Sequence, residues 1–201
     1  CGRYFNLVTI MRKLPYSQWE HIFLDTSILF CYLQASRENN VDAECTVVKK
    51  VIDALNFNTS TNKRKRNFYV SAISIAEMFD KSTDVKKTET IVSKMNISTM
   101  TYVSFDTDIA EHMTSNYHAV LGTTKLNKLA IEMGFPQHDL KMVREWITKD
   151  LMILASADYM MCDTILTVDD NTFIPLCEKV DFFGCSCKKP KFNSNDKYIF
   201  E

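Results

Sequence analysis

The order of apolar and polar positions along the chain predicts alternating strands and helices. Short runs rich in β-branched and aromatic residues predict five strands, at residues 21–24, 68–74, 102–105, 164–168 and 180–183. Apolar residues at helical spacing predict helices between them, at residues 27–34, 41–55, 106–122, 123–133 and 137–161, with another from residue 75. This alternation is typical of an α/β fold in which helices cover both faces of a central parallel sheet.

The length and composition favour one globular domain. The chain has 201 residues, of which only four are glycine and four proline, so long flexible linkers are not expected. We expect an N-terminal extension at residues 1–20, with Met11 as a candidate natural start, one domain at 21–187 and a polar C-terminal tail at 188–201. No run reaches about 18 uninterrupted apolar residues, so we expect no membrane-spanning helix.

The cysteines and the net charge indicate the cellular compartment and the source of any affinity for nucleic acid. Seven cysteines in irregular spacing favour reduced thiols and hence a cytoplasmic protein. Cys185 and Cys187 form a lone CxC pair, for which free thiols are favoured over a zinc site because no second pair lies nearby. The net charge is −1, so any affinity for nucleic acid must come from local patches.

Asp25 directly follows the first predicted strand, in the stretch HIFLDTS. In open α/β sheets, ligands bind beyond the carboxyl ends of the strands, so this carboxylate is expected at the functional edge. Thr26 and Ser27 place two hydroxyl groups beside it. One such acid also has an ordinary explanation, because aspartate is a common helix N-cap.

Other acidic residues occupy comparable places. We expect Glu77 in the first turn of the helix after the second strand, and Asp150 at the start of a helix rich in small residues. Asp169 follows the fourth strand, with Asp170 beside it. Each has an ordinary alternative, since Ser74 to Glu77 matches a capping box, aspartate favours helix starts, and two aspartates suit a turn.

Four carboxylates converging on one point would repel one another unless a cation neutralised them. Hard divalent ions such as Mg²⁺ or Mn²⁺ suit carboxylate and water ligands, and Mg²⁺ commonly uses few protein ligands together with phosphates. Such an ion activates water and relieves charge on a phosphodiester. The acids therefore predict metal-dependent hydrolysis of nucleic acid, with candidate metal ligands at Asp25, Asp150, Asp169 and Asp170.

The segments IFLDTS, VSAISIAE, KDLMILASA and ILTVDDNTF, taken in this order, resemble the motifs of PIN-domain nucleases. The resemblance runs from about residue 21 to 183 and implies a three-layer α/β/α fold with a central parallel sheet. It also implies one or two Mg²⁺ or Mn²⁺ ions and a single-stranded RNA substrate. The residues that match the acidic quartet, expected to be catalytic, are Asp25, Glu77, Asp150 and Asp169. Thr26 and Ser27 match the small polar residues where a hydroxyl can hold a metal-bound water.

The resemblance also suggests partners. Many small PIN proteins are toxins silenced by an antitoxin whose segment enters the active cleft, and others mature ribosomal or transfer RNA. We therefore expect an RNA substrate, an antitoxin or other regulatory protein as partner, and no membrane; a homodimer is a further option. This chain is longer than a compact toxin, with the extra residues between Asp25 and Glu77 and between Glu77 and Asp150, where substrate or partner contacts can form.

The last motif departs from the family pattern T-x-D-x-x-F. Phe173 lies four residues after Asp169 and three after Asp170, so the fourth acid is either of the two aspartates, or both. Two other readings of the whole chain stay open. An aspartate-dependent phosphatase would want D-x-D-x-T, but Ser27 occupies the second carboxylate position. An inactive RNA-binding or assembly module is disfavoured because all four acids are present.

A basic run precedes the second strand. Lys63, Arg64, Lys65 and Arg66 form either a solvated loop or a loop that contacts RNA phosphates. Trp146 and Met142 are interpreted as core or interface residues rather than a base-stacking platform.

Overall fold

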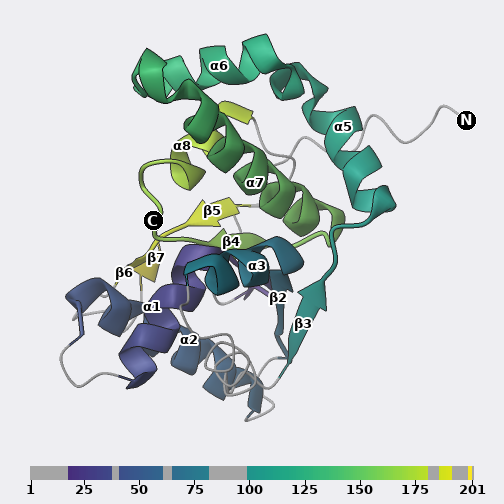
Figure 1. Ribbon diagram of the computed structural model, residues 1–201. Helices are drawn as coiled ribbons and strands as arrows, with labels where there is room; N and C mark the ends of the chain where they lie inside the picture. The colour runs from purple at the N-terminus through teal and green to yellow at the C-terminus, as the bar shows by residue number, and fades with distance from the viewer. Residues whose placement is uncertain are drawn as a thin grey trace, which may run out of the picture.

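The computed structural model describes residues 18–37, 41–60, 65–81, 99–180, 186–191 and 199–200. A five-stranded, all-parallel sheet in the order β3-β2-β1-β4-β5 forms its centre (Figure 1). The strands are β1 (His21–Leu24), β2 (Asn67–Ser71), β3 (Met100–Val103), β4 (Thr164–Leu166) and β5 (Ser186–Lys188). A short antiparallel pair joins β6 (Pro190–Lys191) to β7 (Ile199–Phe200). The predicted parallel α/β sheet is confirmed.

Helices cover both faces of this sheet. Those in the described residues are α1 (Thr26–Arg37), α2 (Ala43–Ser60), α3 (Ala72–Lys81), α5 (Thr107–Leu121), α6 (Thr123–Glu132), α7 (Leu140–Tyr159) and α8 (Phe173–Val180). A 3₁₀ turn, η2 (Gln137–Asp139), precedes α7. Within the described part of the chain, no helix combines the length and apolar character that crossing a membrane requires.

Successive side chains of β1 point to opposite faces of the sheet, and this explains which helices cover each face. Ile22 and Leu24 point to one face and pack with α1 and α2, whereas Phe23 points to the other and packs with α5, α7 and α8. All three side chains are almost fully buried. Helices α1 and α2 therefore lie on one side of the sheet and α5, α7 and α8 on the other, with α6 packed against α7 (Figure 1). This is the three-layer α/β/α arrangement expected from the motifs.

Several predicted boundaries were wrong. The second strand ends at Ser71 rather than at residue 74, because α3 begins at Ala72, and the third strand is Met100–Val103 rather than 102–105. Residues 56–60 belong to α2 rather than to a polar loop, because no glycine or proline stops the helix there. The predicted fifth strand begins at Val180, which instead ends α8, and residues 181–183 lie outside the described residues. The fifth strand is formed by Ser186–Lys188, and β6 packs near α2, so the described part of the predicted tail is attached to the domain.

Other predictions hold. Helix α5 ends at Leu121 beside Gly122, as expected. The helix that follows ends before Gly134, whose φ of 90° lies in the left-handed region that favours glycine. The cysteines of the described residues are free, in line with the predicted reduced thiols; they are Cys31, Cys45, Cys162, Cys177 and Cys187. Cys185 lies outside the described residues, and Cys187 lies in β5.

Candidate active site

A cavity of about 350 Å³ lies where the carboxyl ends of β1 and β4 meet helices α1, α3 and α7. Strands β1 and β4 are neighbours, and the Asp25 N–H donates to the Leu166 carbonyl at 3.0 Å, so the segments that follow the two strands leave the sheet together. The four acids of the predicted quartet all line this cavity, namely Asp25, Glu77, Asp150 and Asp169. The sheet topology thus brings together residues that are far apart in sequence.

Two of these acids reach the cavity from other helix positions than predicted. Asp150 lies in the middle of α7, which begins at Leu140, rather than at a helix start. Glu77 lies in the second turn of α3, because that helix begins directly after β2. The Ser71 hydroxyl accepts a hydrogen bond from the Ile73 N–H at 3.1 Å at this helix start, and Ser74 lies inside the helix. The capping-box interpretation of Ser74 and Glu77 is therefore wrong.

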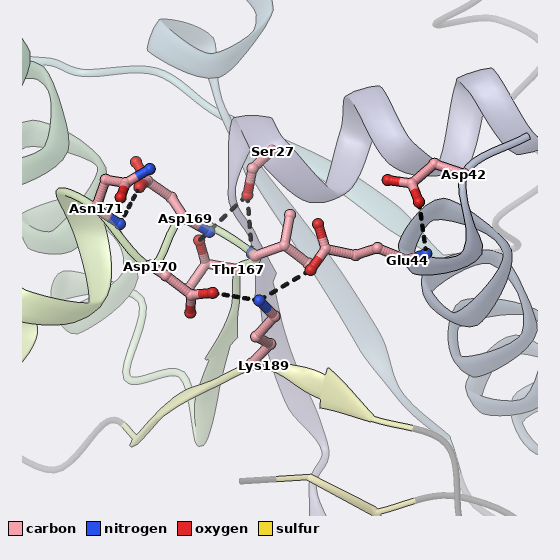
Figure 2. A network of polar contacts seen from close by, with 9 residues as sticks. Ser27, Asp42, Glu44, Thr167, Asp169, Asp170, Asn171 and Lys189 are labelled. Atoms are coloured by element: carbon pink, nitrogen blue, oxygen red, sulfur yellow. Dashed lines mark hydrogen bonds and ion pairs between the residues drawn. The ribbon is translucent and has the colours of Figure 1, made fainter.

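Hydroxyl groups hold Asp25 in place. Its Oδ2 accepts hydrogen bonds from Ser27 Oγ at 2.6 Å and from Thr167 Oγ1 at 2.8 Å, and the Ser27 N–H lies at 3.3 Å. Thr167 also accepts the Asp169 N–H at 3.0 Å, and Ser27 accepts the Val168 N–H at 3.0 Å (Figure 2). These two hydroxyls therefore join the segment after β1 to the segment after β4.

Asp169 and Asp170 point in different directions. Asp169 lines the cavity, and its carboxylate accepts the backbone N–H groups of Asn171 and Thr172, both at 2.9 Å, and the Thr172 hydroxyl. The Asp170 side chain is 58% exposed and does not line the cavity. Its carboxylate instead pairs with Lys189, whose ammonium also lies 2.9 Å from Glu44 of α2 (Figure 2). The geometry therefore favours Asp169 as the fourth acid.

Phe173 accounts for the spacing in this motif. It is fully buried in the core at the first position of α8, four residues after Asp169. The turn between them lets the Asp169 carboxylate bind two backbone N–H groups, while Asp170 turns outward to Lys189.

Glu77 is anchored from two sides. The Thr26 hydroxyl donates to its Oε2 at 2.6 Å, and the Lys149 ammonium lies 3.8 Å from its Oε1. Thr26 and Ser27, the predicted water-orienting hydroxyls, thus both donate to carboxylates of the cavity in this structure. Lys149 precedes Asp150 on α7 and also lines the cavity.

Asp150 lies in a setting that disfavours its negative charge. Its Oδ2 is buried and has no hydrogen-bond partner among the residues that the structure describes. Burial, together with the charges of Asp25 and Asp169, raises the Asp150 pKa well above its ordinary value, while a hydrogen bond from Thr172 opposes the rise. Burial also raises the pKa of Asp25, against the hydrogen bonds from Ser27 and Thr167. The arrangement favours binding of either a proton or a cation.

The donor chemistry fits a hard divalent cation. The cavity offers carboxylate oxygens, one of them buried without a partner, which are the ligands that Mg²⁺ and Mn²⁺ prefer. Among the described residues, no group of three or more His, Cys, Asp or Glu side chains forms a ready-made cluster. Because Mg²⁺ commonly uses one or two carboxylates and keeps several waters, the residues present suit a site completed by solvent and phosphate.

The metal-free protein is expected to become more stable as the pH falls through the raised pKa of Asp150 toward the ordinary value of 3.8. Between the ordinary value of 3.8 and the raised Asp150 pKa, the folded protein binds more protons than the unfolded chain. The stability that this proton contributes is lost as the pH rises through the raised pKa. Thermal unfolding of EDTA-treated protein at several pH values measures how the melting temperature changes with pH. The Asp150→Asn variant has no titrating group at this position, so its melting temperature should change less with pH. Equal changes in the two proteins would contradict the assignment.

The basic run does not form a continuous exposed patch in the described residues. Arg66 is only 3% exposed, so interpreting it as a solvent-facing contact for RNA phosphates is wrong. Lys65 is exposed but does not line the cavity, and Lys63 and Arg64 lie outside the described residues. The cavity contains a different cation, Lys149, which sequence reasoning missed although it neighbours a predicted acid.

Comparisons with known proteins support the fold. No protein-family model and no curated protein matches the sequence. Among solved structures, the chain is similar to the DNA-bound VapBC of Salmonella typhimurium, with 17% identity over 85% of this chain and 98% of that one, at a TM-score of 0.50. It also overlaps VapBC2 of Rickettsia felis bound to a promoter DNA fragment, with 12% identity over 83% and 98%, at a TM-score of 0.47.

A third overlap, with tyrosyl-tRNA synthetase of Leishmania major, has 10% identity over 98% of this chain and 30% of that one, at a TM-score of 0.44. Of the three, only the Salmonella structure reaches a TM-score of 0.50, and at 17% identity it bears on the fold. The five-stranded parallel sheet between two layers of helices matches the fold of this neighbour. The chain has the PIN-like fold.

Proposed function

We propose that this chain is a metal-dependent endoribonuclease that hydrolyses phosphodiester bonds of single-stranded or structured RNA. The observation that carries the proposal is the convergence of Asp25, Glu77, Asp150 and Asp169 in one cavity at the carboxyl edge of a PIN-like sheet. The unpartnered Asp150 Oδ2 supports it further, because a buried carboxylate oxygen in this position favours a cation.

Each acid has a distinct part in the proposal. Asp25, Asp150 and Asp169 would hold one or two Mg²⁺ or Mn²⁺ ions, and Glu77 would orient water. When bound, the metal supplies a water that is nucleophilic near neutral pH and relieves charge on the scissile phosphate. Ser27 and Thr167 hold the Asp25 carboxylate in orientation, as Thr172 holds that of Asp169.

Lys149 gives the cavity a positive group. Its side chain is 42% exposed, and its ammonium lies 3.8 Å from Glu77. Because an exposed lysine keeps freedom to turn toward an anion, Lys149 contacts a non-bridging phosphate oxygen of the bound RNA in this proposal. The ion pair with Glu77 holds the lysine beside the acids until RNA binds.

The proposal includes a protein partner and a location. We propose a toxin whose cavity an antitoxin segment occupies, in the cytoplasm, where free thiols persist. The similarity to a VapBC complex and the free cysteines of the described residues support this part. The long segment between Asp25 and Glu77, which includes α2, offers surface for such a partner.

Electrophoretic cleavage of mixed single-stranded RNA tests the activity. The purified protein should cleave with Mg²⁺ or Mn²⁺, and EDTA should stop the reaction because the metal activates the attacking water. Asp25→Asn should be inactive with metal present. Cleavage that survives both controls would mean a contaminant or another chemistry. A folded, metal-loaded protein that cleaves neither RNA nor DNA would favour the inactive binding module.

A further inference from the structure

Trp146 is placed unusually for a tryptophan. It is 42% exposed and lines the same cavity as the acids, so of its two interpretations, core or interface residue, the first is wrong. Within the described residues, its ring takes part in no aromatic or cation–π contact. The other tryptophan, Trp19, is 1% exposed and belongs to the core. A large apolar ring left open beside the polar side chains of this cavity is suited to covering a flat ligand group.

Helix geometry sets the position of this ring relative to the acids. Trp146 lies four residues before Asp150 on α7, so the two side chains share one helix face and are about 6 Å apart along the axis. Lys149 lines the cavity from the same face. In RNA, one sugar joins each base to its phosphate. The Trp146 ring lies one turn of α7 from the Asp150 carboxylate, so it is placed to receive the base next to a phosphate bound at the acids.

The cavity favours a single unpaired nucleotide over a duplex. Its volume of about 350 Å³ lies at the lower end of the range for small-ligand sites. Phe30 of α1 adds a second apolar side chain to the lining. Aromatic platforms of this kind bind single strands, because the bases of a duplex are already stacked on one another.

We infer that Trp146 is a stacking platform for the nucleobase next to the scissile phosphate. The inference rests on the proposed RNA-cleaving function and specifies its substrate as RNA with an unpaired, unstacked base at the cleavage position. Stacking is tolerant of base identity, so the platform selects for strandedness rather than for sequence. Trp146 positions the substrate, and the acids carry the chemistry.

Intrinsic tryptophan fluorescence tests the platform directly. Only two tryptophans are present and Trp19 is buried, so quenching on ligand binding reports Trp146. In stopped-flow mixing with Mg²⁺, a short single-stranded RNA of mixed sequence should quench the signal before turnover. The same ribose-phosphate chain without bases should not. Trp146→Phe should remove the quench while it keeps a ring for stacking. Equal quenching by both oligomers would overturn the inference.

Steady-state cleavage kinetics separate the role of Trp146 in substrate binding, seen in KM, from the chemical step, seen in kcat. Trp146→Ala should raise KM for single-stranded RNA roughly 5- to 150-fold, with Trp146→Phe close to wild type and kcat little changed. Tyr159→Ala is the matched control, because Tyr159 lies on the same helix and is also 42% exposed but does not line the cavity. An unchanged KM for Trp146→Ala in a cleaving enzyme would overturn the platform alone. Base-dependent quenching without any cleavage would support the platform and reject the proposed hydrolysis.

Discussion

Asp150→Asn is expected to lower cleavage by about 10³-fold while it raises the melting temperature of the metal-free protein. The activity falls because loss of a metal ligand removes several kcal/mol of transition-state stabilisation, and each 1.4 kcal/mol is worth about tenfold. The stability rises because a neutral amide of the same shape ends the repulsion that raises the Asp150 pKa. Each kcal/mol regained corresponds to about 2–4 °C. Electrophoretic cleavage and thermal unfolding with EDTA measure the two effects.

Asp158→Asn provides the matched control on the same helix. Asp158 has only 9% of its side chain exposed, and it accepts hydrogen bonds from His112 at 2.7 Å and Tyr117 at 3.2 Å, away from the cavity. Its replacement should leave cleavage unchanged, because Asp158 does not line the cavity.

Adding metal ions tests the wild type and Asp150→Asn in a second way. Mg²⁺ or Mn²⁺ should raise the melting temperature of the wild type but not that of Asp150→Asn, since the ion binds only the folded carboxylates. A lower melting temperature for metal-free Asp150→Asn, or wild-type cleavage by it, would refute the assigned role of Asp150.

Thr167→Val is expected to lower both stability and activity. Thr167 is fully buried, and its hydroxyl donates to Asp25 and accepts from the Asp169 N–H. Valine keeps the shape but leaves both partners short of a hydrogen bond in a buried setting, which costs about 1–3 kcal/mol, or several degrees in melting temperature. Because supporting hydrogen bonds orient metal ligands, cleavage should fall about 10- to 100-fold. Chemical denaturation and the cleavage assay measure the two losses.

Thr164→Val is the control for that substitution. Thr164 is equally buried, at the first position of β4 and three residues before Thr167, but its hydroxyl donates to the Ser186 carbonyl at 2.8 Å, away from the cavity. It should lose comparable stability and keep its activity. If both variants lose activity alike, general destabilisation rather than the Asp25 hydrogen bond explains the loss.

The convergence of the acids could be predicted because it depends on a general property of parallel sheets. Asp25 and Asp169 follow apolar strands, and strands of one parallel sheet end at the same edge. The position of Asp150 could not be read in the same way. Residues 140–150 contain no glycine or proline to begin a new helix, so α7 runs through them and Asp150 reaches the cavity from mid-helix.

Two elements near the C-terminal end of the domain gave little local signal. Pro175 suggests that no helix forms at residues 173–180, yet proline is tolerated in the first turn of a helix. Helix α8 forms there, and its Phe173, Leu176 and Cys177 side chains pack into the core. Strand β5 has three residues, too few for an alternation, and it is defined by its pairing with β4. The exposure of Trp146 depends on tertiary packing, so the sequence likewise does not predict it.

Lys189 gives the loop that follows β4 a dependence on ionic strength. One ammonium joins Asp170 of that loop to Glu44 of α2, and 22% of the Lys189 side chain is exposed to solvent. The loop therefore cannot shift away from α2 without separating at least one of the two charge pairs. Dissolved salt weakens such partly exposed pairs, because the screening length shortens from about 10 Å at 0.1 M to about 3 Å at 1 M. We therefore expect the backbone beside Asp169 to be held more firmly in dilute buffer than in concentrated salt.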